Sequence, residues 1–199
     1  MTKKVAILAS GNGTNAENLI RYFRRRQSAE VALVLTNRSA AYVLQRAEAL
    51  GVPALCFNKE EWADGQPVLH ALAAHGIDFV VLAGFLARVP GNILHAYPQR
   101  MVNIHPSLLP KFGGKGMYGD RVHQAVLEAG EAESGITIHY VNERYDEGAI
   151  IRQYACPVLP GDTPDTLAAR VHQLEYEHYP EVVETLLQAL PNIVAPLED

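Results

Sequence analysis

The chain is poor in cysteine: only Cys56 and Cys156 occur among its 199 residues. They lie in different halves of the chain and form no Cys-x-x-Cys spacing, which argues against a disulfide framework and against a zinc module held by cysteine pairs. Two buried thiols in a reducing compartment fit this pattern better. We therefore expect the protein to be cytoplasmic.

Long apolar runs are also lacking. No stretch approaches the roughly 18 consecutive apolar residues that a membrane-spanning helix requires. The apolar run near the N-terminus is too short for the core of a signal peptide. We therefore expect a soluble protein that has no membrane partner.

Positive charge is in deficit, because 17 Lys and Arg stand against 22 Asp and Glu and give a net charge of -5 at pH 7. Binding a nucleic-acid backbone needs a large basic field, so we expect no nucleic-acid partner.

The eight histidines form no His-x-x-x-His pair, and the helical pair Glu175 and His178 lacks further ligands. We predict small-molecule substrates, no metal, and a monomer or a weak homodimer.

Apolar runs rich in Val, Ile and Leu recur along the chain, with helix-like segments between them. Runs that are nearly continuous are typical of parallel strands covered by helices on both faces. Two later segments, joined by a tight turn, indicate an antiparallel pair. The sequence thus predicts an α/β fold: a three-layer, doubly wound, mostly parallel sheet with a Rossmann-like N-terminal half and an antiparallel edge. The expected strands occupy residues 4–8, 31–35, 52–57, 78–83, 100–104, 135–141 and 149–158.

A long amphipathic helix is predicted near the end of the chain. Thr163 is placed to cap it and Pro164 suits its first position. Pro180 is expected to break or kink this helix, so that residues 181–190 form a second helical piece. We predict one domain over residues 1–199.

The segment ASGNGTN follows the first expected strand and contains a Gly-x-Gly pair. The third glycine of a dinucleotide fingerprint is missing, and the second strand ends without an acidic residue for a ribose, although Arg38 is suited to the 2′-phosphate of NADP. Gly11 and Gly13 also allow backbone N–H groups to turn toward a phosphate, and Thr14 and Asn15 begin a helix. An NADPH-binding reductase, a phosphate site and a plain turn all remain open at this point.

The segment NIHPSLLP places Asn103 and His105 two residues apart, just beyond a buried strand. Residues at this spacing on an extended chain face the same way. An amide that donates to a developing oxyanion and an imidazole that moves a proton suit acyl transfer. No Gly-x-Ser-x-Gly elbow is present, so direct transfer to an amine is favoured. Asp146, in YDEGAI, either orients the histidine and raises its pKa or serves ordinary turn chemistry.

Taken together, the motifs SGNGTN, LAGFLARV, NIHPSLLP, DEGAI and EYEHYP resemble those of the glycinamide ribonucleotide formyltransferases, in the same order and spacing over nearly the whole chain. The resemblance implies transfer of a formyl group from the co-substrate 10-formyltetrahydrofolate to the amine of glycinamide ribonucleotide, in purine biosynthesis. Other folate-dependent formyltransferases and deformylases share the Asn-x-His and Asp elements. They usually carry a further domain, whereas we expect this chain to end about where the catalytic domain ends.

Carried over by position, the resemblance implies a role for each motif. Asn103 would hold the formyl oxygen, and His105, protonated with help from Asp146, would assist there and shuttle protons. The implied substrate-binding residues are Gly11, Asn12, Gly13, Thr14 and Asn15 at the phosphate and Glu175 at the ribose. The implied folate-binding residues are Leu86, Ala87, Arg88, Val89, Asn103, Asn142, Glu143, Arg144, Tyr145 and Asp146.

The resemblance also divides the chain into two halves. Residues 1–100 would form a phosphate-binding, Rossmann-like half, and residues 101–199 a catalytic and folate-binding half. The glycine-rich segment 111–119 has no periodic apolar pattern and is expected to act as a lid over both substrates.

Overall fold

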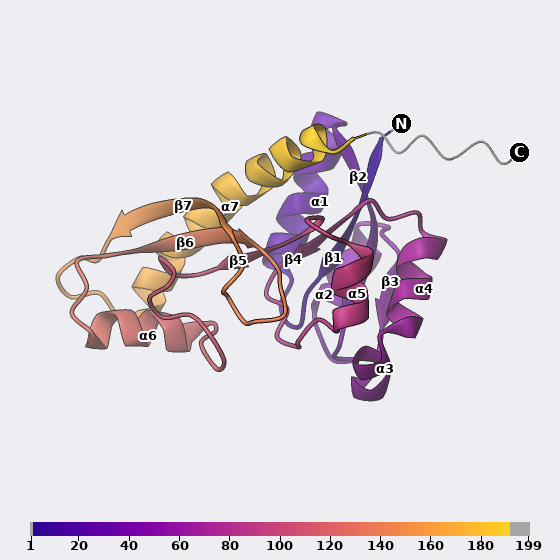
Figure 1. The fold of residues 1–199 in the computed structure, drawn as a ribbon. Helices are drawn as coiled ribbons and strands as arrows, with labels where there is room; N and C mark the ends of the chain where they lie inside the picture. The colour runs from indigo at the N-terminus through magenta and orange to yellow at the C-terminus, as the bar shows by residue number, and fades with distance from the viewer. Residues whose placement is uncertain (1, 192–199) are drawn as a thin grey trace, which may run out of the picture.

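A computed structural model describes residues 2–191 and contains one seven-stranded sheet (Figure 1). The strand order is β3-β2-β1-β4-β5-β6-β7. The first five strands pair in parallel, and β6 and β7 join them as antiparallel neighbours at one edge. The strands are β1 (Lys3–Leu8), β2 (Ala29–Thr36), β3 (Ala54–Cys56), β4 (Phe79–Leu82), β5 (Met101–His105), β6 (Glu133–Tyr140) and β7 (Ile150–Pro157).

Helices cover both faces of the sheet. One buried cluster joins the sheet to α1, α2, α6 and α7, and a second cluster joins the opposite face to α3, α4 and α5. The helices are α1 (Thr14–Arg26), α2 (Val43–Ala49), α3 (Lys59–Asp64), α4 (Gln66–Ala74), α5 (Gly91–Ala96), α6 (Asp120–Glu128) and α7 (Pro164–Ala189). The predicted fold class is therefore confirmed, and each of the seven expected strand segments contains or overlaps a strand.

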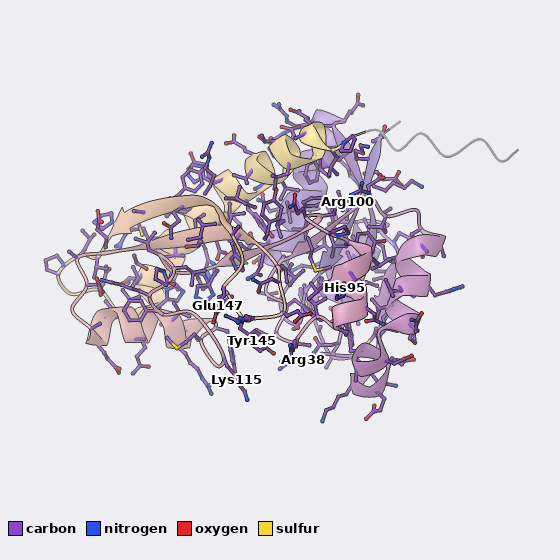
Figure 2. The ribbon with its side chains drawn as sticks, viewed as in Figure 1. Arg38, His95, Arg100, Lys115, Tyr145 and Glu147 are labelled. Carbon is purple, nitrogen blue, oxygen red and sulfur yellow. The ribbon has the colours of Figure 1, made fainter. Side chains whose placement is uncertain are left out.

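The alternation of side chains along β1 explains why its apolar run is continuous. Val5 and Ile7 point into the first cluster, while Ala6 and Leu8 point into the second. Many charged side chains lie at the surface, and Arg38, Lys115 and Glu147 are all exposed (Figure 2). None of the helices among residues 2–191 combines the length and apolarity needed to cross a membrane.

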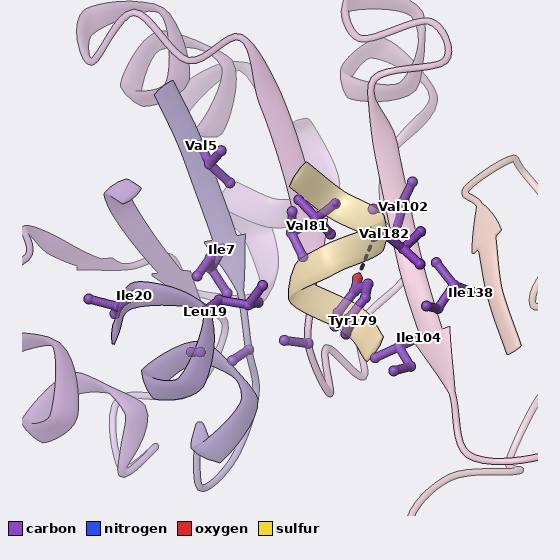
Figure 3. Packing of buried hydrophobic residues seen from close by; sticks show 14 of the residues in the cluster. Val5, Ile7, Leu19, Ile20, Val81, Val102, Ile104, Ile138, Tyr179 and Val182 are labelled. Carbon is purple, nitrogen blue, oxygen red and sulfur yellow. Dashed lines mark hydrogen bonds between the residues drawn. The ribbon is translucent and has the colours of Figure 1, made fainter. Parts of the chain in front are cut away.

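Helix α7 lies across the first cluster and is anchored by a fully buried tyrosine (Figure 3). The hydroxyl of Tyr179 donates to the carbonyl of Leu82 at 2.8 Å and approaches the carbonyl of Val102 at 3.4 Å. Burial raises the pKa of Tyr179 well above its ordinary value, so the hydroxyl keeps the proton that it donates. This contact ties α7 to β4 and β5, the strands that lead into the cleft described below.

Pro180 does not break α7, so the prediction of a second helical piece over residues 181–190 is wrong. A proline lacks the N–H that would bond to the carbonyl four residues earlier. Here that carbonyl belongs to Tyr176, and the side-chain amide of Asn18 donates to it at 2.9 Å. A neighbouring helix thus supplies the missing donor, and the helix continues.

The expectation of two buried thiols is half correct. Cys156 is buried, but Cys56 is exposed. Cys56 ends β3, a three-residue strand at the edge of the sheet that pairs only with β2. A short edge strand has a neighbour on one side only, and its last residue therefore remains open to solvent.

The Tyr179 contact yields a stability prediction. Tyr179→Phe removes a buried donor while keeping the ring, so the free energy of unfolding is expected to fall by about 1 kcal/mol. Urea denaturation followed by circular dichroism measures this change. Tyr176→Phe is the control, because Tyr176 is 38% exposed and no decrease is expected there. An unchanged stability in Tyr179→Phe would show that the hydroxyl contributes nothing to the packing of α7.

Candidate active site

A cleft of about 530 Å³ opens at the carboxyl ends of the central parallel strands. Its walls come from the segments after β1, β4 and β5, together with the loop before α6, the residues near Asp146, and α7. The order of the strands reverses between β1 and β4, and such a reversal leaves a crevice into which ligands bind in open α/β sheets. Lys115 and Tyr145 both line this cleft and lie on the same side of the molecule (Figure 2).

The segment after β1 presents free backbone N–H groups to the cleft. Gly13 has φ of 76° and occupies the N-cap of α1, and no side chain caps the helix there. The first N–H groups of a helix have no partner within the helix, and its N-terminus carries partial positive charge. Gly11, Asn12, Gly13, Thr14 and Asn15 all line the cleft. The structure therefore brings together every predicted phosphate-binding residue at a site suited to an anion.

Glu175 reaches the same end of the cleft from α7. It is 4% exposed, and its carboxylate accepts hydrogen bonds from Asn15 at 2.8 Å and from His172 at 2.9 Å. The hydrogen bond from His172 to Glu175 raises the pKa of His172 despite the opposing effect of burial. Glu175 is thus a buried carboxylate held in place beside the phosphate-binding segment.

Two buried polar atoms in this region have no hydrogen-bond partner among the described residues: Oδ1 of Asn15 and Nδ1 of His123. Both side chains line the cleft. Burial, and then the nearby His172, lower the pKa of His123, so its imidazole is neutral near pH 7. Unpartnered buried polar atoms are costly, and they are commonly found where a ligand supplies the missing partner.

Asn103 and His105 project from β5 toward the cleft, as their spacing predicts. Nδ1 of His139, on the neighbouring strand β6, donates to the carbonyl of Tyr140 at 2.9 Å. Its Nε2 lies 3.2 Å from the amide nitrogen of Asn103 and 3.6 Å from Oδ1 of Asp146. His139 thus holds the side-chain amide of Asn103 close to the carboxylate of Asp146.

His105 is 3% exposed and has an acceptor on each side. Its Nε2 donates to the carbonyl of Phe112 at 2.8 Å, and its Nδ1 lies 3.5 Å from Oδ2 of Asp146. Asp146 has φ of 56° and also accepts from the N–H of Gly114 at 2.9 Å. The structure therefore brings Asp146 to His105 and joins both residues to the segment 111–119.

The pKa of His105 differs from our expectation. Burial lowers it below its ordinary value and outweighs the raising effects of Asp146 and of the Phe112 carbonyl. Burial alone would raise the pKa of Asp146, but His139, His105 and the N–H of Gly114 together hold it below its usual range. His105 is therefore neutral beside an ionised Asp146 near pH 7, in contrast to the protonated histidine that the resemblance implies.

The segments predicted to bind folate meet at a second, smaller cavity of about 60 Å³. Its lining includes Phe85, Asn103, Tyr145 and Asp146, which also line the larger cleft, so the two spaces adjoin. Leu86 lines the larger cleft, and the guanidinium of Arg88 donates to the backbone carbonyl of Glu143 at 3.0 Å. The other predicted folate-binding residues around the smaller cavity are Ala87, Val89, Asn142 and Arg144.

The residues found at the cleft differ in part from those that the sequence predicts. Arg38, on which an NADPH site depends, is exposed and does not line the cleft. His123, His139 and His172 lie at the site but were not predicted. His172 stands three positions before Glu175, on the same face of a helix, and this spacing is a signal that the sequence does contain. His123 and His139 come from elements whose packing cannot be read from spacing.

No group of three or more His, Cys, Asp or Glu side chains is placed to hold a metal ion within the part of the chain that the structure describes. The polar groups that line the cleft are instead backbone N–H groups, amides, imidazoles, separate carboxylates and the cationic side chains of Lys115 and Arg121. Such a set suits an anionic, hydroxyl-bearing ligand.

Comparisons with known proteins point in the same direction. Residues 3–183 match a family model described as formyl transferase. A chloroplastic phosphoribosylglycinamide formyltransferase from Arabidopsis thaliana is 42% identical over 94% of this chain, which spans 66% of that relative, just under two thirds of its length. A phosphoribosylglycinamide formyltransferase from Bacillus subtilis is 38% identical, with 93% of this chain and 95% of the relative covered.

A solved structure agrees with these sequence relatives. The crystal structure of phosphoribosylglycinamide formyltransferase from Bacillus halodurans superposes with a TM-score of 0.87 at 38% identity. The superposition covers 96% of this chain and 98% of that one.

The contact between His105 and Asp146 yields a prediction about titration. Asp146→Asn keeps the shape of the side chain but removes the charge that raises the pKa of His105, so the midpoint of His105 is expected to move to lower pH. Imidazole ¹⁵N chemical shifts followed against pH measure it. Glu147→Gln is the control, because Glu147 is an exposed neighbour that pairs with Arg144. A midpoint that rises, or that shifts equally in both variants, would contradict the assignment of Asp146 as the partner of His105.

Proposed function

The chain belongs to the formyl transferase family, and we propose that it transfers a formyl group from 10-formyltetrahydrofolate to the amine of glycinamide ribonucleotide. One observation carries this proposal: a single cleft holds an uncapped helix N-terminus at one end and Asn103, His105 and Asp146 at the other. A phosphorylated substrate bound at the first end presents its amine at the second. The names of the relatives, which are phosphoribosylglycinamide formyltransferases, support the same formyl acceptor.

The phosphate end is the better defined. The N–H groups of Gly13, Thr14 and Asn15 face an anion with the partial positive charge of α1 behind them. The buried carboxylate of Glu175 is a strong acceptor for ribose hydroxyls, which are hydrogen-bond donors. The orphaned atoms of Asn15 and His123 take their partners from the same ligand.

At the other end, the amine nitrogen of the ribonucleotide attacks the formyl carbon of the folate. The carbonyl oxygen gains negative charge as the C–N bond forms, and a side-chain N–H of Asn103, which lines the cleft, donates to it. Nε2 of neutral His105 carries a proton, which it donates to the backbone carbonyl of Phe112. The unprotonated Nδ1 therefore accepts the proton that the amine loses, and Asp146 stabilises the resulting imidazolium. The tetrahedral intermediate collapses when the C–N bond to the folate breaks, and the folate nitrogen leaves with that proton.

The folate lies in the adjoining cavity, between the segments 86–89 and 142–146. Asn103 and Asp146 border both spaces, so a formyl group held there meets the amine at their boundary. The side chain of Leu86 is 36% exposed and that of Tyr145 is 43% exposed, and both offer hydrophobic surface for an aromatic ring system. No metal takes part in this scheme.

The work is divided between two halves of one domain. Residues 1–100 hold the phosphate, and residues 101–199, of which the last eight lie outside the described residues, supply the catalytic groups and most of the folate site. The segment 111–119 acts as a lid, supported by its contacts to His105 and Asp146. The enzyme works in the cytoplasm as a monomer or weak homodimer, with thiols that are not joined in a disulfide.

Formyl transfer to glycinamide ribonucleotide is the direct test. The wild-type protein is expected to consume 10-formyltetrahydrofolate only when the ribonucleotide is present. Asn103→Ala and His105→Ala are each expected to lower kcat by about a hundredfold or more, since they remove the oxyanion donor and the proton acceptor. The absorbance change on loss of the formyl group gives the rate.

His70→Ala is the matched control, because His70 is an exposed histidine outside the cleft and its loss is expected to leave kcat unchanged. Full turnover in both Asn103→Ala and His105→Ala would overturn the mechanism. Turnover by the wild-type protein without the ribonucleotide would point instead to a deformylase.

A further inference from the structure

The phosphate-binding segment is held from behind by α2. The N–H of Val43, the first residue of α2, donates to the carbonyl of Gly11 at 3.1 Å. The side chain of Val43 fills the space beside Gly13, since a Cβ at position 13 would lie 2.4 Å from its methyl group. These two contacts fix the beginning and the end of the Gly-x-Gly turn.

Arg46, one turn further along α2, holds the middle of the segment. Its Nε donates to the backbone carbonyl of Asn12 at 2.8 Å, and a terminal nitrogen donates to the side-chain carbonyl of Asn12 at 2.9 Å. The other terminal nitrogen pairs with Glu17 in the first turn of α1. The guanidinium also lies 5.0 Å from the centre of the Tyr42 ring. Every nitrogen of the guanidinium therefore donates a hydrogen bond.

Fixing the carbonyl of Asn12 determines where the next N–H points. In a trans peptide the C=O of one residue and the N–H of the next point in opposite directions. Since Arg46 draws the Asn12 carbonyl toward α2, the N–H of Gly13 turns to the other side of the peptide. No described residue accepts a hydrogen bond from this N–H, and Gly13 lines the cleft.

We propose that Arg46 is a positioning residue for the substrate's phosphate: it orients the Asn12–Gly13 peptide so that the N–H of Gly13 meets a phosphate oxygen. The inference rests on the proposed function for the identity of the substrate. Arg46 does not line the cleft and therefore acts through Asn12 rather than by touching the ligand. Its hydrogen bond holds the pKa of Glu17 below the ordinary value, so an ionised carboxylate neutralises the guanidinium.

The geometry requires arginine rather than a positive charge alone. The planar guanidinium presents its donors in a fixed fork. Here one edge donates to the backbone and side-chain carbonyls of Asn12, while the remaining terminal nitrogen donates to Glu17. A lysine ammonium is a point charge on a flexible stem and cannot hold all three groups at once. Arg46→Lys therefore separates the role of the fork from that of the charge.

Steady-state kinetics of Arg46→Lys and Arg46→Gln, with glycinamide ribonucleotide and with the riboside that lacks the phosphate, tests the inference. With the ribonucleotide, KM is expected to rise by about tenfold or more in both variants while kcat stays within about twofold. The reason is that the phosphate contact is equally strong in the ground state and the transition state, so its loss weakens binding without slowing the chemical step. With the riboside, kcat/KM is expected to match that of the wild-type protein. A general structural defect would lower activity on both substrates.

Arg21→Gln is the matched control. Arg21 also pairs with Glu17, at 2.9 Å, but makes no contact with Asn12, so the KM for the ribonucleotide is expected to stay at the wild-type value. A wild-type KM in Arg46→Gln, or an equal loss with ribonucleotide and riboside, would overturn the proposal. So would an Arg46→Lys variant that binds the ribonucleotide as well as the wild-type protein does.

Titration with inorganic phosphate, followed through the amide ¹H–¹⁵N resonance of Gly13, separates this inference from the proposed reaction. The wild-type resonance is expected to shift on binding, and Arg46→Gln is expected to need about tenfold more phosphate for the same shift. This result would support the role of Arg46 even if the wild-type protein transferred no formyl group. Equal phosphate affinity in both proteins would refute that role even if formyl transfer were observed.

Discussion

Strands β1 and β4 pair in parallel in the middle of the sheet, and the chain leaves them in opposite directions. After β1 it moves outward to β2 and β3, and after β4 it moves the other way to β5. The segments that follow these two strands therefore cannot cover each other, and the space between them stays open. Ser10 joins the two walls: its N–H donates to the carbonyl of Gly84, and its hydroxyl accepts from the N–H of Leu86. The cleft, its anion site and its link to β5 all depend on this reversal.

The two ends of the cleft differ in electrostatics, and this difference gives a bound ligand its direction. One end offers helix N–H groups, which suit a phosphate. The other end offers an ionised Asp146 beside a neutral His105, so it can take up a proton but does not attract a second anion. A ligand with a phosphate at one end and an amine at the other is complementary to this arrangement. Burial that lowers the pKa of His105 thus contributes to orientation as well as to proton transfer.

Much of the fold could be predicted from the sequence, because apolar periodicity reports directly on burial. The continuous run of β1 and the spacing of Asn103 and His105 both depend on the two-residue repeat of a strand. The short helices α3 and α5 were not predicted, since six residues hold too few turns for a periodic signal. The continuity of α7 through Pro180 depends on Asn18, a residue remote in sequence. Propensity alone cannot reveal such a compensation.

Some of the site residues could likewise be predicted from local sequence motifs, and others could not. Residues 11–15, 103 and 105 lie in contiguous motifs, whereas His123, His139 and Arg46 reach the site only through tertiary packing. The shift in the pKa of His105 likewise depends on burial, which no local pattern reports. In the proposed reaction both substrates occupy one cleft, and the formyl group passes directly between them. Initial rates measured while both substrate concentrations are varied test this: intersecting double-reciprocal lines are expected for a ternary complex, and parallel lines from a formyl-enzyme intermediate would contradict direct transfer.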